Sequence, residues 1–280
     1  MWGTVLASAL NPGTSSYLSP SMKRITRKSY ALPYAVFLAL FVVIPLFLIL
    51  LYALTAPDGH WTLQNFAKFF SQTQAVNTFV YSLGIAMITT MVCILIGYPI
   101  AYILSNPRYN RSQTLVMLFI LPMWINFLLR TLATVALFDF LRIPLGEFSL
   151  VFGMVYNFLP FMILPIYNIL QKMDKNLIEA AQDLGANPRQ VFLKTTLPLS
   201  LPGVASGIMM VFMPTISTFA IAELLTVNNI KLFGTVIQES INNNLWNYGS
   251  ALSLIMLLLI GATTMLTSRE GSSREGGGLW

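Results

Sequence analysis

The hydrophobic positions of this chain fall into six long, continuous runs separated by polar or proline- and glycine-containing connectors. A helix that crosses the hydrocarbon core of a bilayer needs about 20 mostly apolar residues. The runs are continuous rather than alternating, which favours helices over the strands of a barrel. We therefore predict an all-α membrane protein with six transmembrane helices, at Leu32–Leu54, Phe79–Leu104, Thr114–Phe138, Leu150–Leu170, Val204–Leu225 and Tyr248–Thr267.

Composition supports a membrane protein. The 280 residues are 56% hydrophobic and 9% charged, whereas soluble domains carry about 25% charged residues. The net charge of +6 could suggest a nucleic-acid partner, but the basic residues are spread along the chain, so we predict contact with lipid and not with nucleic acid. The single cysteine, Cys93, excludes a disulfide within the chain and argues against a cysteine-based metal cluster.

The distribution of lysine and arginine predicts the orientation, because basic loops stay in the cytoplasm. One side of the predicted bundle carries Lys68, Arg142 and Lys231. The other side, which we assign to the cytoplasm together with both termini, carries Lys23, Arg24, Arg27, Lys28, Arg108, Arg111, Lys172, Lys175, Arg189, Lys194, Arg269 and Arg274.

The chain divides into three parts on this basis. Residues 1–31 form a cytoplasmic N-terminal segment, and the first apolar run is longer than a signal-peptide core, which favours an uncleaved helix. Residues 32–267 form the transmembrane domain, with a cytoplasmic loop at 172–200. Residues 268–280 are of low complexity, and we expect a disordered cytoplasmic tail.

The loop between the fourth and fifth spans carries a specific pattern, DKNLIEAAQDLGANPRQVFLKTTLPLSLP from Asp174 to Pro202. Asp174 or Asn176 can cap a first helix, and Gly185 stands where a helix ends in a left-handed residue. Asn187 and Pro188 can start a second helix, which we expect Pro198 to end. Further positions with helical spacing place four apolar side chains on one face, namely Leu177, Ala180, Ala181 and Leu184.

This pattern resembles the EAA loop of binding-protein-dependent ABC importer permeases, although Thr195 stands where that family usually has isoleucine. The resemblance implies a MetI-like six-helix bundle whose loop docks in a groove of the ATPase subunit. It assigns the ATPase contact to Glu179, Ala180, Ala181, Asp183 and Gly185. The alternative is an ordinary amphipathic loop.

The resemblance extends over about residues 22–268. The stretches 97–105, 121–130 and 159–186 are similar to the spermidine/putrescine permeases of that family, which implies polyamine import across a bacterial cell membrane by alternating access. It also implies partners: ATPase subunits in two copies, a second homologous permease and an extracytoplasmic substrate-binding protein. Alternatives are another cargo, such as a metal complex or an anion, or a channel or intramembrane enzyme.

No catalytic or metal-binding constellation can be assembled from the sequence. There is no Walker A pattern, and the single histidine, His60, has no metal-ligand partners in helical spacing. We therefore predict no enzyme activity and no cofactor in this chain, with ATP and magnesium bound by a separate ATPase.

Carboxylates and aromatic faces are the groups that would attract a polyamine. Glu223 is the leading acidic candidate, placed near the outer end of the fifth predicted span, although it can equally be a helix-end carboxylate in water. Asp139 is a weaker candidate, and so is Glu239. The aromatic candidates, which can also be packing residues, are Trp124, Tyr156, Phe158, Phe161 and Phe219.

Arg130 does not suit a cation carrier. It shares a helix face with Asn126, one turn away. We expect it to pair with a carboxylate, either Glu223 or one on the partner permease, or else to extend to the membrane interface.

Overall fold

The computed structural model describes residues 27–106 and 114–275. Apart from one isolated antiparallel bridge between Thr55 and Trp61, regular structure in these ranges is helical. The α-helices are α1 (Arg27–Leu38), α2 (Ile44–Ala53), α3 (Gln64–Ser71), α4 (Thr73–Ser105), α5 (Thr114–Ile120), α6 (Phe127–Phe140), α7 (Glu147–Lys172), α8 (Lys175–Asp183), α9 (Pro188–Val191), α10 (Leu197–Ser217), α11 (Ala220–Thr226), α12 (Phe233–Asn242) and α13 (Trp246–Glu275).

The chain separates into two units, residues 1–48 and residues 49–280. The first unit contains α1, and a π-helical turn at Ala39–Val43 continues it into α2. Large apolar side chains such as Phe37 and Phe41 are exposed along this helix. A helix that is apolar all round is typical of a membrane span, and the segment Pro33–Ala53 has the length and hydropathy of one.

Five helices of the described chain are long and apolar enough to cross a membrane, and a bent pair makes a sixth candidate. The third expected span, Thr114–Phe138, corresponds to this pair and is broken into two helices rather than continuous. A 3-10 turn containing Pro122 follows α5, and Ile125 adopts an extended conformation. The Asn126 side chain then accepts from the backbone N–H of Leu128 (2.8 Å) and starts α6 at 92° to the preceding segment.

The fifth span also differs from its prediction. Helix runs without interruption from Pro188 to Ser217, and Pro198 lies inside it. A π-helical segment at Phe192–Thr196 precedes this proline and shifts the hydrogen-bond register, so that the missing proline N–H does not end the helix. Thr218 is extended, which places Glu223 on the separate helix α11 and not in the fifth span.

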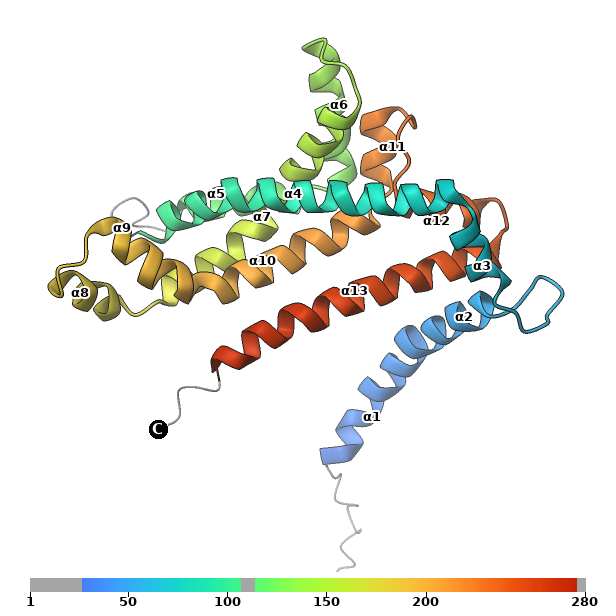
Figure 1. The fold of residues 1–280 in the computed structure, drawn as a ribbon, viewed down its shortest axis with the longest axis horizontal. Helices are drawn as coiled ribbons and strands as arrows, with labels where there is room; N and C mark the ends of the chain where they lie inside the picture. Colours follow the sequence, from blue (N-terminus) through green and yellow to red (C-terminus); the bar gives the residue numbers. More distant parts are fainter. Residues whose placement is uncertain (1–26, 107–113, 276–280) are drawn as a thin grey trace, which may run out of the picture. The chain divides into compact units, whose positions relative to one another are not determined.

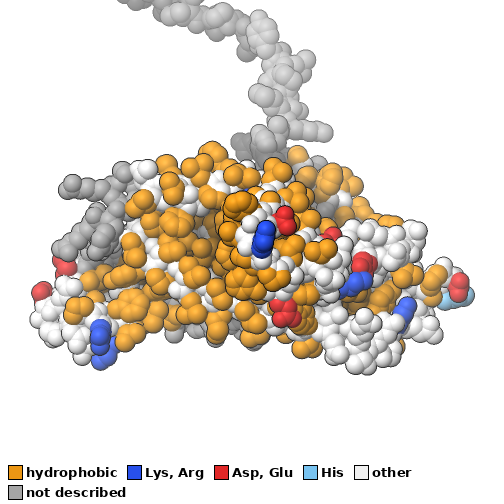
Figure 2. All heavy atoms as spheres, turned by 90° about the horizontal axis from the view of Figure 1, so that it is seen from above, with side chains coloured by type: hydrophobic (Ala, Val, Ile, Leu, Met, Phe, Trp, Pro, Cys, Tyr) orange, Lys and Arg blue, Asp and Glu red, His pale blue; other side chains and the backbone are white. Residues whose placement is uncertain are grey.

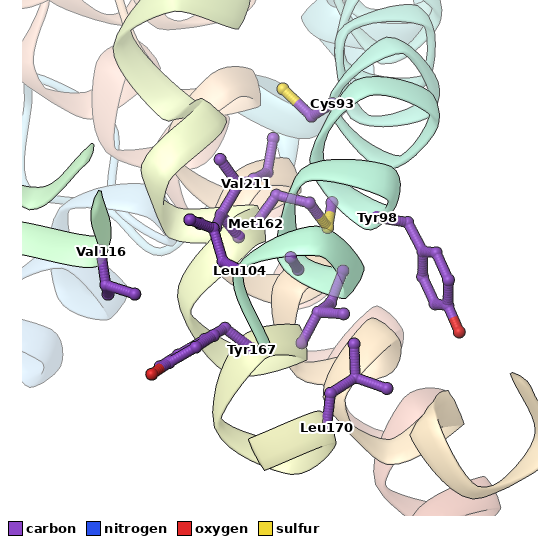
Figure 3. Close-up of a cluster of buried hydrophobic side chains, with 11 residues drawn as sticks. Cys93, Tyr98, Leu104, Val116, Met162, Tyr167, Leu170 and Val211 are labelled. Carbon is purple, nitrogen blue, oxygen red and sulfur yellow. The ribbon is translucent and has the colours of Figure 1, made fainter. Parts of the chain in front are cut away.

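The main core lies where α4, α7 and α10 pack against one another. Figure 3 shows part of it, with Cys93 from α4, Met162 from α7 and Val211 from α10 among the buried side chains. Gly203 and Gly207, one turn apart on α10, let the helix backbones approach closely. A Cβ atom at Gly207 would lie 3.2 Å from the Met162 carbonyl oxygen, and one at Gly203 would lie 3.0 Å from that of Pro165.

A second core forms at the opposite end of α4, where α3, α12 and the start of α13 meet (Figure 1). Phe69, Phe79 and Phe233 make edge-to-face contacts there. The Asn247 side chain donates to the carbonyl of Thr55 (2.7 Å) and ties α13 to the segment after α2.

Helices α6 and α11 project together to one side of α4, α7 and α10 (Figure 1). Leu150 and Met154 of α7 pack with Ile221 and Leu225 of α11 in a third core. Hydrophobic side chains cover most of the surface seen from the side to which α6 and α11 project (Figure 2).

The C-terminal helix is longer than expected. α13 continues to Glu275, so the expected disordered segment 268–280 is helical through that residue. A helix continues through polar residues where nothing breaks it, and hydropathy alone does not locate its end. Residues 1–26 and 276–280, which include most of the expected N-terminal segment, lie outside the described residues, as do Arg108 and Arg111.

Candidate functional site

The loop between α7 and α9 is a helical hairpin that local side chains hold in shape. The Asp174 carboxylate accepts from the Asn176 N–H (3.0 Å) and begins α8. Gly185 has φ of +83° and ends that helix, as its position in the sequence predicts. Asn187 and Gln190 exchange side chain–backbone hydrogen bonds of 2.9 Å across the first turn of α9, which is a reciprocal N-terminal cap.

The outer surface of this hairpin carries apolar side chains that the described chain does not cover. Leu184 is 89% exposed and Leu177 is 48% exposed. Glu179, Ala180 and Asp183 are exposed beside them. An open cavity of about 450 Å³ lies between the two helices and is lined by Ala181, Leu184, Gly185, Ala186, Gln190, Lys194 and Thr195.

A second cavity lies where the two interrupted helices meet the middle of α7. The bend between α5 and α6 contributes Trp124 and Asn126, and the break between α10 and α11 contributes Thr218 and Phe219. This space, the α6–α11 cavity, has a volume of about 500 Å³. It is lined by Met123, Trp124, Ile125, Asn126, Phe127, Arg130, Asn157, Phe158, Phe161, Pro214, Ser217, Thr218, Phe219, Ala220 and Ile221.

Arg130 is the charged side chain in the lining of the α6–α11 cavity. It is only 6% exposed, and its Nε and Nη1 atoms have no hydrogen-bond partner. Its guanidinium carbon lies 5.9 Å from the centre of the Tyr156 ring, within the range of a cation–π contact. Within the described residues no carboxylate forms an ion pair with Arg130, so the expected pairing with Glu223 is absent.

Asn157 adds a second buried polar group to the same wall. Its Nδ2 donates to the Gly153 carbonyl (2.9 Å) and lies 3.4 Å from the Thr131 hydroxyl. Its Oδ1 is buried without a partner. Buried polar atoms are nearly always paired, so two unpaired groups on one cavity wall indicate a site that takes a polar ligand.

The structure brings together most of the aromatic residues that the sequence singled out as path candidates. Trp124, Phe158, Phe161 and Phe219 line the α6–α11 cavity, and Tyr156 lies beside the lining residue Arg130. Glu223 is half-buried on α11 but is not part of the lining, and Asp139 is exposed in the last turn of α6.

Three residues acquire a role in these surfaces that the sequence did not give them. Asn157 had no signal beyond being an amide inside an apolar run. Arg130 was expected to pair with a carboxylate, but the sequence did not place it in the lining of a cavity. Leu184 lay on the predicted apolar face of α8. Its position at the end of that helix, where it is exposed, makes it available for contact with another protein.

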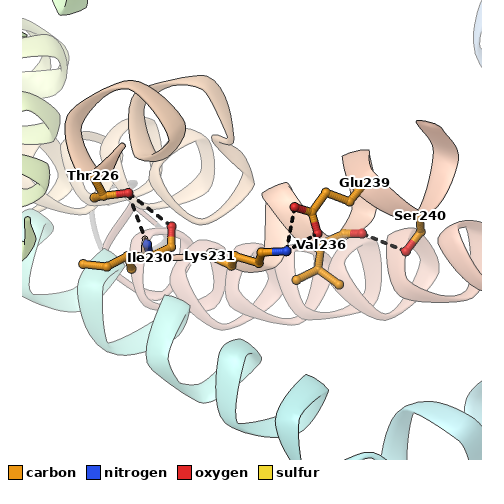
Figure 4. A network of polar contacts seen from close by, with 6 residues as sticks. All are labelled: Thr226, Ile230, Lys231, Val236, Glu239 and Ser240. Atoms are coloured by element: carbon orange, nitrogen blue, oxygen red, sulfur yellow. Dashed lines mark hydrogen bonds and ion pairs between the residues drawn. The ribbon is translucent and has the colours of Figure 1, made fainter. Parts of the chain in front are cut away.

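Glu239, the other acidic candidate, forms an ion pair within this chain. Its carboxylate pairs with Lys231 at 2.7 Å (Figure 4). Both residues line an open cavity of about 670 Å³ at the end of the bundle that holds α3 and α12. Nearby, the Lys68 amine lies 4.8 Å from the centre of the Tyr248 ring.

No group of three or more potential metal ligands occurs among residues 27–106 and 114–275. What the described chain does have is up to six candidate spans, an uncovered helical hairpin at one end, and a mid-span cavity at two helix breaks. Interrupted helices around a central cavity are a feature of membrane transporters. The class that this architecture defines is a multi-pass membrane transport component.

Comparison with known proteins gives the family. Residues 59–269 match the model of the binding-protein-dependent transport system inner membrane component. The chain belongs to this family of permeases. It is 34% identical over 266 residues to the spermidine/putrescine transport system permease protein PotB of Haemophilus influenzae, covering 85% of this chain and 93% of that protein. With PotB of Escherichia coli it shares 32% over 219 residues, covering 72% and 79%.

Solved structures give the same fold. A bacterial ABC transporter that imports the acidic polysaccharide alginate has a chain that superposes with a TM-score of 0.65 over 86% of this chain and 94% of its own, at 14% identity. The alginate transporter in complex with an alginate-bound periplasmic protein gives a TM-score of 0.67 over 86% and 91%, at 11% identity. The expected all-helical permease bundle is confirmed.

Proposed function

We propose that this chain is a permease subunit of an ATP-driven importer whose cargo is a polyamine such as spermidine or putrescine. The observation that carries the cargo assignment is the similarity to polyamine permeases over nearly their whole length. An extracytoplasmic binding protein delivers the cargo, and a second permease completes the path. We also propose the orientation that the basic residues predict, with both termini and the α8–α9 hairpin in the cytoplasm.

The energy for import comes from ATPase subunits, in two copies, which bind ATP and magnesium and dock on the α8–α9 hairpin. The uncovered apolar side chains there, above all Leu184, support this role. The small residues Ala180 and Ala181 leave room for close approach, and Glu179 and Asp183 supply charge beside them.

The α6–α11 cavity is the part of the path that we assign to this chain. Its aromatic lining, with Trp124 and Phe219, offers faces for cation–π contacts with ammonium groups at about 0.5–2 kcal/mol each. Glu223 and Asp139, which lie on the two projecting helices but not in the lining, are proposed as acidic groups that attract the cargo.

Uptake by the reconstituted complex tests the function. The chain is purified with its ATPase, second permease and binding protein and placed in liposomes containing ATP. We expect accumulation of radiolabelled spermidine that excess unlabelled putrescine reduces. ATP-dependent import that neither polyamine competes with would overturn the cargo but not the permease function. A matched complex with Glu179→Lys should lose the ATPase during purification, and retention at the parental level would overturn the docking surface.

One observation favours a second cargo class. The charged side chain in the cavity lining is Arg130, which attracts anions and repels ammonium groups. An anionic solute is therefore the alternative. Competition by small carboxylates in the same uptake assay, with no effect of spermidine, would favour it.

A further inference from the structure

The α6–α11 cavity contains a positive charge for which the described chain provides no negative partner. Arg130 is 94% buried, and two of its three nitrogen atoms have no acceptor. The Asn157 Oδ1 atom is unpaired on the same wall. Leaving a buried cation without a counter-charge is strongly unfavourable, which points to an anionic group from outside the described chain.

The location of the cavity restricts the source of that group. It lies at the level of Asn157 and Phe161, near the middle of the span α7. The hydrocarbon core of the bilayer at that depth has no anionic group, and lipid is excluded. A polyamine is itself a cation and would be repelled by the guanidinium. A protein carboxylate fits, since arginine binds carboxylates through two parallel hydrogen bonds.

We propose that a carboxylate side chain of a second permease subunit enters the α6–α11 cavity and pairs with Arg130. This proposal rests on the proposed function, from which the second permease comes. The Tyr156 ring on one side of the guanidinium holds the arginine in place for its partner.

The surroundings of Arg130 have the character of a subunit contact. The lining of the cavity includes large exposed apolar side chains, among them Trp124 at 83%, Ile125 at 52% and Phe127 at 45% exposure. Apolar side chains around a buried charged anchor exclude water and strengthen such an anchor. The projecting position of α6 and α11 leaves this surface open to another subunit (Figure 1).

The pair would also remove the conflict between an arginine and a cationic cargo. Once neutralised, the guanidinium no longer repels ammonium groups, and the aromatic lining determines the contacts. The charge pair then specifies which permease can join this one, because an uncharged or basic side chain in its place would leave Arg130 unpaired.

Zero-length coupling tests the contact directly. The variant Arg130→Lys places an amine in the cavity, and dicyclohexylcarbodiimide joins an amine to a carboxylate in contact with it. The amide C–N bond forms as one carboxylate oxygen leaves with the reagent as dicyclohexylurea. We expect an amide between residue 130 and an acidic residue of the second permease, identified by mass spectrometry of the membrane complex.

Arg142→Lys is the matched control, because Arg142 is exposed just beyond the end of α6. It should give no amide to the second permease. An amide from residue 130 to Glu223 of the same chain, equal coupling at both positions, or no amide in a complex that retains both permeases would each overturn the proposal.

Copurification supplies an independent measurement if Arg130→Lys does not accumulate. In detergent, Arg130→Met should retain the second permease at least about tenfold less than Arg142→Met, because it leaves the partner carboxylate buried and unpaired. Equal retention would overturn the proposal. Spermidine uptake by the parental complex is measured in parallel. If spermidine is taken up but residue 130 forms no amide, the charge pair is rejected and the cargo assignment stands. If the amide forms but spermidine is not taken up, the cargo assignment is rejected and the charge pair stands.

Discussion

Gly185 is the residue on which the shape of the α8–α9 hairpin depends. Its φ of +83° is in the left-handed region, and a Cβ atom there would meet nothing within 4 Å. A side chain at this position is therefore opposed by backbone conformation and not by a clash. The strain of a left-handed residue is about 1–2 kcal/mol, greatest for β-branched side chains and small for asparagine.

We predict that Gly185→Val weakens ATPase binding while the permease still inserts in the membrane. Gly185→Asn is the control, because it fills the same space but tolerates the left-handed conformation. The measurement is the amount of ATPase that copurifies with equal amounts of permease. Equal loss in both variants would mean that space, and not conformation, is what the position requires.

Glu223 tests whether an acidic residue beside the cavity attracts the cargo. Its carboxylate is half-buried on α11 and forms no ion pair within the described residues. We predict that Glu223→Gln raises the spermidine concentration needed for half-maximal uptake by roughly fivefold, from the loss of an attraction of about 1 kcal/mol. Glu147→Gln, which removes an exposed carboxylate bonded to the Tyr81 hydroxyl, is the control. If Glu223→Gln and the parental chain give identical uptake curves, Glu223 is a helix-end carboxylate that meets water and does not attract the cargo.

At the scale of elements, the contact between α7 and α10 depends on small residues. Gly207 faces the backbone of Met162, and its Cβ position lies 2.7 Å from the Met162 sulfur. Gly84 on α4 has nothing within 4 Å of the same position. We predict that Gly207→Val destabilises the purified protein by about 1–3 kcal/mol, as overpacking does, whereas Gly84→Val changes it by less than half as much.

Thermal aggregation in detergent measures both variants. Gly207→Val should aggregate at a temperature several degrees lower than the parental chain. If Gly84→Val and Gly207→Val aggregate at the same temperature, the close approach of α7 and α10 does not contribute to stability.

The sequence predicted the number of candidate spans and the local structure of the hairpin for different reasons. Spans follow from long apolar runs, and the caps at Asp174 and Asn187 follow from contacts within three residues. The interruptions at Ile125 and Thr218 depend instead on extended backbone inside apolar sequence, where hydropathy gives no signal. Pro198 was expected to end a helix because a π-helical register shift was not considered.

The candidate cavity was predictable only in part for the same reason. Trp124 and Phe219 were singled out by residue type, but nothing in the local sequence shows that they lie on one cavity. Asn157 and Arg130 come from different helices, and only the folded chain reveals that their polar atoms are both unpaired. Glu223 was assigned to the fifth span because the break before α11 could not be read from the apolar pattern.

For the whole molecule, orientation in the membrane is open to a direct test. We predict that a cysteine at Asp58 reacts with an impermeant maleimide added to spheroplasts, whereas a cysteine at Lys172 reacts only after the membrane is permeabilised. Both positions are exposed, and the native Cys93 is fully buried and should stay unlabelled. The reverse labelling pattern would invert the proposed topology.

The π-helical segment at Phe192–Thr196 has a mechanical consequence. Because it joins α9 to α10 without a break, one helix of 30 residues extends from the hairpin to Ser217 at the α6–α11 cavity. At 1.5 Å per residue, this rod is about 45 Å long. A displacement of its end at the hairpin is transmitted along one continuous helical backbone as far as Ser217. The first break in this helix is at Thr218, which lines the α6–α11 cavity, so a displacement at the hairpin would change the shape of that cavity.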